Sequence, residues 1–330
     1  MHCHVSIKAM TIILIFCITT SYASNCVPSI KQDDNDALVI KQIEALDRYE
    51  EQMTKASNKK LLQKCKELFV DVAQIGILEF FIFSLAVIAH EVGHLIAAQS
   101  LLEVRPNEPI TVDIGTYTPQ ETPLLFSWGN IRFYRDLPWT KGQTSLSPLA
   151  KKGSEAFEKY RNFYTGIIIV AGGLSGAAFL YMLLVVITAY CAYADGKGLS
   201  EVALKSFINA ASPFSYIVNT KALSDTQKRF LLNAVLVIGL YLIYNIFYGC
   251  TPYRAGDGVR IWKKNLGVTG STLEMVHCLS ALGAWGCWAL LVKNYCDARK
   301  KFSSSDSQMP LLVALISLLS LRTRLVPKLA

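Results

Sequence analysis

Long apolar blocks alternate with polar stretches along this chain of 330 residues. Four of the blocks are long enough to cross the hydrocarbon core of a bilayer, which needs about 20 helical residues. They are the segments from about Val72 to Leu102, Phe163 to Tyr193, Phe230 to Tyr248 and Met275 to Tyr295. The pattern predicts an all-α polytopic membrane protein with about four core transmembrane helices.

The N-terminal residues 1–23 have the order of a secretory signal peptide. One lysine precedes a short apolar stretch from Met10 to Ile18, and the small residues Ser21-Tyr22-Ala23 follow it. This order predicts a signal peptide that is cleaved after Ala23, although the stretch would also fit an uncleaved anchor.

Residues 24–67 are polar and balanced in charge, and we expect them to form an extracytoplasmic helical segment. Their apolar members recur at helical spacing, at Val39, Ile43, Leu46 and Met53. Two of the nine cysteines, Cys26 and Cys65, lie in this segment. After export they would form a disulfide or remain free thiols, and the spacing leaves both open.

The polar insert 103–161 separates the first two apolar blocks. Within it, PITVDIG and PLLFSWGNIRFYRD are rich in β-branched and aromatic residues and are bounded by proline and glycine. These features predict β-strands inside a core that covers residues 68–296. A short apolar stretch, MPLLVALISLLSL, lies in the C-terminal tail 297–330, where it rests in the interface or crosses the membrane.

Composition and charge agree with a membrane protein. The chain is 52% hydrophobic and 18% charged, whereas soluble domains carry about a quarter charged residues. The net charge of +8 is spread over several loops, so we expect a lipid bilayer and no nucleic acid as a partner. Basic residues place the loop 250–274 on the cytoplasmic side. A bacterial inner membrane and a eukaryotic secretory-pathway membrane both fit.

The first apolar block contains AHEVGH, which places three ionisable residues in an apolar surrounding. His90 and His94 are four residues apart, so they share one helix face and can bind one ion together. Neutral imidazole is a good ligand for zinc, and a carboxylate at Glu91 can act as general base toward a water on the metal. A polar helix interface without metal is the weaker interpretation, because ionisable residues inside membrane spans are rare and tend to be functional.

A zinc hydrolase of this kind needs a third protein ligand. His2 and His4 lie in the expected signal peptide, and His277 is better explained as a hydrogen-bonded interface histidine. The stronger candidate is Asp257 in TPYRAGDGV, where Pro252 breaks the preceding helix. Irregular backbone at membrane depth is tolerated where it faces protein or a water-filled cavity. Taken alone, Asp257 would be read as a surface turn residue.

Three motifs in the same order, HEVGH, AGGLSG and TPYRAGDG, resemble the signatures of the site-2 protease family. Members of that family are polytopic intramembrane zinc metalloproteases with a compact core of three helical spans. The resemblance implies that His90, His94 and Asp257 bind one Zn2+ per chain and that Glu91 is the catalytic base. In the family, a strand-rich insert after the first motif lies near the active site and helps to hold an extended substrate.

The resemblance also implies a substrate-binding region, in which this chain departs from many members. Those members carry asparagines where this chain has Gly176 and Gly249, and Asn245 lies one helical turn from the latter. The substrate-binding residues expected on this basis are Gly172, Gly173, Gly176, Asn245 and Pro252. Glu79 shares a helix face with His90. It is expected either to line an interior cavity or to be a carboxylate at the helix end, near the membrane interface.

The sequence therefore predicts an intramembrane zinc metalloendopeptidase that cleaves transmembrane protein substrates in or near their helices, in regulated intramembrane proteolysis. The alternative is a catalytically silent membrane protein of the same fold that binds client membrane proteins. Glycines at the two asparagine positions favour that alternative, and the intact HEVGH motif opposes it. A histidine-rich di-iron oxidase is excluded, because it needs about eight histidines and the chain has five.

Overall fold

A computed structural model describes residues 36–102, 110–116, 118–135, 142–146, 155–249, 257–302 and 315 of the chain. Four predicted features lie outside the described residues: the expected signal peptide, Cys26, Pro252 and, except for Leu315, the C-terminal apolar stretch. The chain divides into two compact units, Met1–Gln63 and Lys64–Ala330, which we describe separately.

The described part of the first unit is helical. It belongs to helix α2, which runs from Asp36 to Leu101. The sequence predicted a short helical segment before the first apolar block, but the two are continuous. Neither glycine nor proline occurs between Asp36 and Ile75, so nothing in the backbone interrupts the helix there. Cys65, at the start of the second unit, is exposed and has a free thiol.

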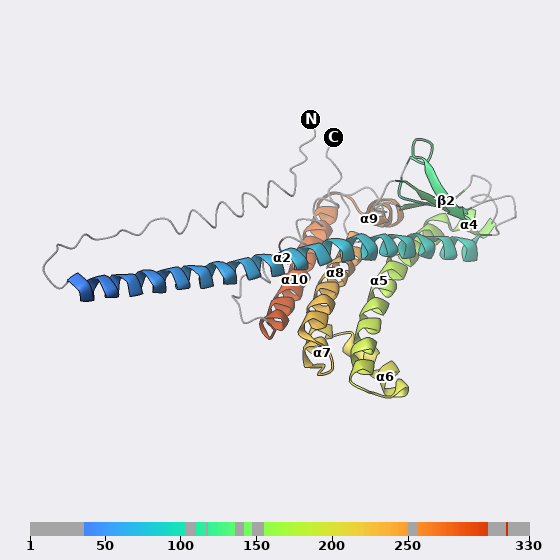
Figure 1. Ribbon diagram of the computed structural model, residues 1–330. Helices are drawn as coiled ribbons and strands as arrows, with labels where there is room; N and C mark the ends of the chain where they lie inside the picture. The colour runs from blue at the N-terminus through green and yellow to red at the C-terminus, as the bar shows by residue number, and fades with distance from the viewer. Residues whose placement is uncertain are drawn as a thin grey trace. The chain divides into compact units, whose positions relative to one another are not determined.

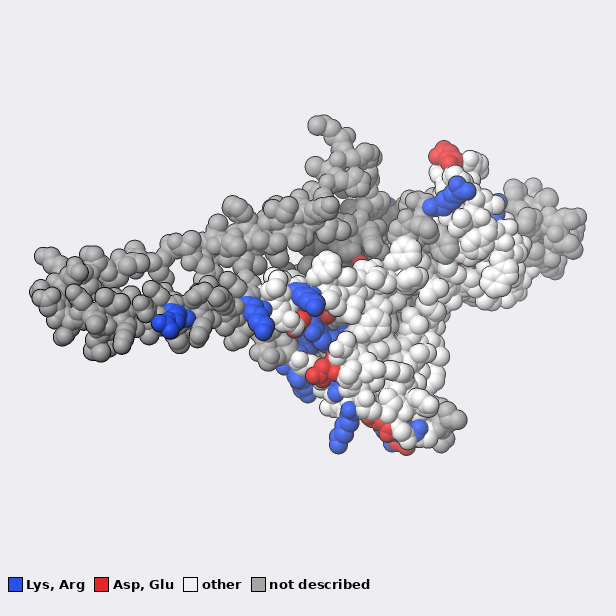
Figure 2. All heavy atoms as spheres, viewed as in Figure 1, with Lys and Arg blue, Asp and Glu red and all other residues white. Residues whose placement is uncertain are grey.

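Four helices in the described residues are long and apolar enough to cross a membrane. They are the stretch Leu62–Leu101 of α2, α5 (Arg161–Ala194), the stretch Asp225–Phe247 of α8 (Asp225–Gly249), and α10 (Gly270–Lys300). They contain most of each of the four predicted apolar blocks, which confirms a mostly helical, multi-pass class. On the face shown in Figure 2, coloured charged atoms gather toward one end of the helices and on the sheet, while much of the surface between them is white.

Helix α8 lies at the centre of the helical packing in the second unit. It packs against α5 on one side and α10 on the other (Figure 1). Its buried residues, among them Leu232, Leu236 and Tyr241, join a core cluster with Phe83 of α2. The rings of Phe83 and Tyr241 are stacked with centroids 4.6 Å apart. By contrast, α10 is exposed over most of its length.

Short elements connect the long helices. They are α4 (Glu155–Lys159), α6 (Leu199–Asn209), α7 (Pro213–Asn219), α9 (Asp257–Val259) and the π-helix η1 (Arg260–Asn265). Proline occupies the first turn of α7, where its missing N–H costs no helical hydrogen bond. The α9–η1 pair follows α8 and brings Asp257 toward α2.

The insert forms a four-stranded sheet: three strands lie in the two stretches predicted to form strands, and the fourth lies outside them. The strands are β1 (Ile110–Ile114), β2 (Leu124–Trp128), β3 (Ile131–Tyr134) and β4 (Gly142–Leu146). Their order is β2-β3-β1-β4, with β1 parallel to β3 and antiparallel to β4. Ile110, Val112 and Ile114 of β1 are fully buried and cluster with Leu95 and Ala98 of α2. This packing fixes the sheet against the C-terminal part of α2.

Candidate metal centre

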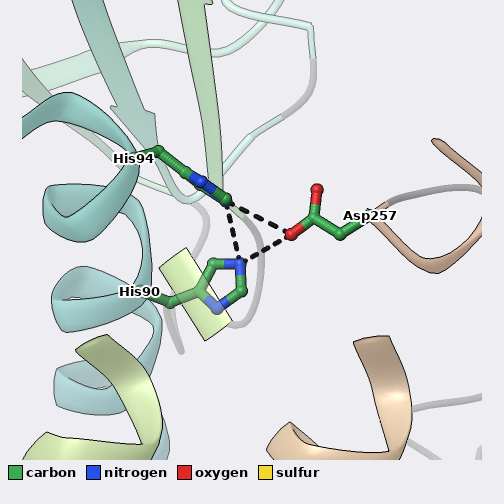
Figure 3. Close-up of side chains that lie close together, drawn as sticks. All are labelled: His90, His94 and Asp257. Atoms are coloured by element: carbon green, nitrogen blue, oxygen red, sulfur yellow. Dashed lines mark hydrogen bonds and ion pairs between the residues drawn. The ribbon is translucent and has the colours of Figure 1, made fainter. Parts of the chain in front are cut away.

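His90 and His94 project from one face of α2 toward Asp257, the first residue of α9 (Figure 3). The two Nε2 atoms are 3.0 Å apart. Oδ2 of Asp257 lies 3.0 Å from Nε2 of His90 and 3.2 Å from Nε2 of His94. The structure therefore brings the three predicted ligands together, although Asp257 is separated from His90 by 167 positions.

Helix α5 fixes the orientation of the His94 ring. Nδ1 of His94 lies 2.7 Å from the backbone oxygen of Ile168. Because a carbonyl oxygen only accepts, Nδ1 carries the proton and the neutral ring presents the lone pair of Nε2 to its partners. Gly172 supplies the space for the ring, since a methyl group there would lie 2.2 Å from Cε1 of His94.

The three ligand atoms fit a tetrahedral zinc site. All of them lie within 4.8 Å of one another. Atoms bound to zinc at about 2.0–2.1 Å in tetrahedral geometry are about 3.3 Å apart, close to the separations seen here. Two imidazole lone pairs and a carboxylate oxygen at these distances need a proton or a cation between them. Within the described ranges, no other group of three histidine, cysteine or acidic side chains meets this criterion.

The carboxylate of Asp257 is set to be ionised. Burial raises the pKa of Asp257, but when a proton takes the place of a metal ion on the imidazoles, the hydrogen bonds and positive charge of His90 and His94 outweigh that effect. The net pKa is held below the usual range for an aspartate. An ionised carboxylate is the form that binds a metal ion.

Glu91 is buried beside the ligands and is covered by strand β4. Its side chain is 6% exposed. Oγ1 of Thr144 donates a hydrogen bond of 2.9 Å to Oε2 of Glu91. A methyl group at Gly142 would lie 2.6 Å from Cγ of Glu91 and 3.0 Å from Oε1. Sequence reasoning missed both β4 residues, since nothing in KGQTSL marks them and only the docking of the sheet brings them to α2.

The structure describes four of the expected substrate-binding residues. Gly172, Gly173 and Gly176 lie on α5, and Asn245 lies on α8 beside them. Asn245 of α8 donates a hydrogen bond of 2.8 Å to the carbonyl oxygen of Gly173. A methyl group at Gly176 would lie 2.9 Å from Nδ2 of Asn245. The glycines thus admit the Asn245 side chain, while Gly172 admits His94. Their role toward a substrate stays a prediction.

Two other polar residues of interest lie apart from the ligand group. Glu79 is 2% exposed, which excludes an exposed interfacial carboxylate and agrees with an interior position. His277 lies on α10 and does not belong to the group of three potential ligands. Its interpretation as an interface histidine stays a prediction.

No family model, curated protein or solved structure matches this chain. The resemblance to site-2 proteases therefore rests on the three short motifs. What the protein does is argued from the site itself.

Proposed function

We propose that this protein is an intramembrane zinc metalloendopeptidase of the site-2 protease type. Its substrates would be membrane proteins cleaved in or next to their transmembrane helices, as in regulated intramembrane proteolysis. The observation that carries the proposal is the convergence of His90, His94 and Asp257 beside Glu91, on a helix apolar enough to cross a membrane.

Each residue of the site has a role in peptide hydrolysis. His90, His94 and Asp257 hold the metal, and bound zinc supplies the Lewis acidity that hydrolysis at neutral pH requires. The Glu91 carboxylate takes a proton from the attacking water and then delivers it to the amine that leaves. Because Glu91 is buried, other water molecules do not compete for the proton, which passes from the attacking water to the leaving amine.

Two of the candidate ligands are partly accessible to solvent. The side chains of His90 and Asp257 are 16% and 15% exposed. Strand β4 is an edge of the sheet and lies against Glu91. An edge strand presents backbone donors and acceptors to which an extended segment can pair. A substrate helix unwound along β4 would pass beside the catalytic base.

The proposal includes an orientation in the membrane. If the N-terminal segment is exported, α2 enters from outside and His90 lies toward its cytoplasmic end. Lys263 and Lys264, in the last turn of η1, then belong to a cytoplasmic loop, in agreement with the positive-inside tendency. Both a bacterial inner membrane and a eukaryotic secretory-pathway membrane fit this orientation.

A catalytically silent client-binding protein of the same fold is the second candidate. It is favoured by the way β4 covers Glu91, with Thr144 bonded to one carboxylate oxygen and Gly142 set against the other. Such a protein would keep zinc and would bind membrane clients without cutting them.

Replacement of Glu91 by glutamine separates the two candidates. Purified protein in liposomes is given zinc and a fluorescent single-span substrate, and product is measured with time. The proposal predicts cleavage by the wild type and a loss of at least about 100-fold in Glu91→Gln, with the zinc content unchanged. The control is Glu274→Gln, at an exposed glutamate of α10, which should cleave normally. Full activity of Glu91→Gln would refute the mechanism, and a zinc-loaded wild type without activity would favour the silent protein.

A further inference from the structure

Strand β4 contacts Glu91 through alternate residues. Gly142 and Thr144 are two positions apart, so they share one face of the strand, and that face meets α2. The Oγ1 atom of Thr144 lies 2.9 Å from Oε2 of Glu91 and 3.3 Å from the backbone oxygen of the same residue. One hydroxyl thus reaches both the side chain and the main chain of Glu91.

The strand is held rigidly enough for this contact to be specific. It pairs with β1 along its whole length, from Ile110 opposite Leu146 to Ile114 opposite Gly142. The buried residues of β1 in turn pack against α2. The position of Thr144 over Glu91 is therefore set by the register of the sheet and by its hydrophobic contact with the helix.

The opposite face of the sheet has a polar network of its own. Asp113 of β1, 1% exposed, accepts hydrogen bonds from Arg132 at 2.7 and 2.9 Å and from Tyr134 at 3.1 Å. Gln143, between the two residues that contact Glu91, reaches the same carboxylate at 3.4 Å. This network ties β4 to β1 and β3 on the face opposite to Thr144.

We propose that Thr144 is a positioning residue, whose hydroxyl holds the Glu91 carboxylate in the rotamer that the reaction needs. The inference rests on the proposed peptidase function and adds to it a residue outside the three motifs. A glutamate has three rotatable side-chain bonds, and a proton-transfer group must be held within about 0.5 Å of its working position. Gly142 contributes by the absence of a side chain, which leaves room for the carboxylate next to Thr144.

Two substitutions at Thr144 test the role of the hydroxyl. Thr144→Val keeps the shape of the side chain and removes the hydrogen bond, whereas Thr144→Ser keeps the hydroxyl. We expect kcat to fall about 10–100-fold in Thr144→Val with KM and zinc content unchanged. Thr144→Ser should restore most of the lost rate. The control is Ser145→Ala, at the neighbouring exposed position, which should match the wild type.

A second readout does not depend on catalysis. In zinc-free protein, the infrared carboxylate band of Glu91 is found as the difference between the wild type and Glu91→Gln. That band should shift in Thr144→Val and stay in place in Ser145→Ala.

An unchanged kcat in Thr144→Val, or an unchanged band, would overturn the proposal. A higher kcat would also overturn it, since β4 would then be a cover that the substrate must displace. If the wild type shows no Glu91-dependent cleavage, the peptidase function fails and the catalytic role of Thr144 fails with it. A shifted band would then show that the contact itself exists, which separates the two failures.

Discussion

Asp71 and Asp257 both have polar partners in largely apolar surroundings. The partners of Asp71 are arginines, and those of Asp257 are histidines. Asp71, on α2, accepts hydrogen bonds from the guanidinium groups of Arg229 and Arg299. Asp257 faces the imidazoles of His90 and His94. An arginine is always charged, whereas a neutral imidazole offers a lone pair. The first cluster contains its own cations, and we propose that the second receives one.

The Asp71 cluster joins three helices; its carboxylate is buried, while the Arg229 side chain is 24% exposed. Asn233 of α8 donates to Oδ1 of Asp71 at 3.0 Å, and Tyr295 of α10 donates to Oδ1 of Asn233 at 2.8 Å. The side chains of Asp71 and Arg299 are only 5% and 7% exposed. We interpret this cluster as a structural link between α2, α8 and α10.

The candidate metal centre differs in the chemistry of its partners. Its three ligand atoms converge on one point, and two of its side chains are about 15% exposed. Buried charge alone therefore does not identify a functional site in this protein. We propose that a set of lone pairs converging on one point is the better indicator of such a site.

Loss of the Asp71 carboxylate should produce the largest change in stability. In Asp71→Asn the buried Arg299 loses its ion-pair partner, whereas Arg229 keeps Glu67, 3.3 Å away. We expect a decrease of about 3–5 kcal/mol in the free energy of unfolding, measured by denaturant titration in detergent micelles. Zinc content should stay normal where the protein is folded.

The matched control is Asp297→Asn on α10. Asp297 is 54% exposed and lies 3.7 Å from Lys300, and exposed pairs contribute at most about 1 kcal/mol. Equal effects of the two substitutions would contradict the structural role of the Asp71 cluster.

A smaller, local effect is expected from Gly172→Ala on the metal centre. The added methyl group would overlap the His94 ring and turn it away from the metal. Displacing a ligand through its surroundings typically weakens metal binding about 10–100-fold, and chelator competition measures this affinity. Gly173→Ala is the control, because a methyl group there meets nothing within 4 Å. If both variants bind zinc as the wild type does, Gly172 does not position His94.

Some parts of this site could be predicted from the sequence and others could not. The pairing of His90 with His94 follows from helix geometry alone. Asp257 was selected because a two-histidine site lacks a third ligand and Pro252 breaks the helix before it; no local rule brings it across 167 positions. The apolar blocks predicted the spans, since length and hydropathy decide whether a helix can cross a bilayer.

The contacts that depend on docking were not predictable. Thr144 reaches Glu91 only because the sheet packs on α2 in one register. Asp71 meets Arg299 across 228 positions, and nothing near either residue in the sequence indicates the pair. Gly172 was expected to bind substrate, but its visible role is to give space to His94.

Zinc content tests the central claim most directly. Wild type, Asp71→Asn, Asp257→Asn and His94→Ala are loaded with zinc, dialysed against a weak chelator and analysed for metal per chain. We predict one zinc per chain in the wild type and in Asp71→Asn, and loss of zinc from Asp257→Asn and His94→Ala. Zinc retained by Asp257→Asn, or a wild type that holds none, would contradict the metal centre.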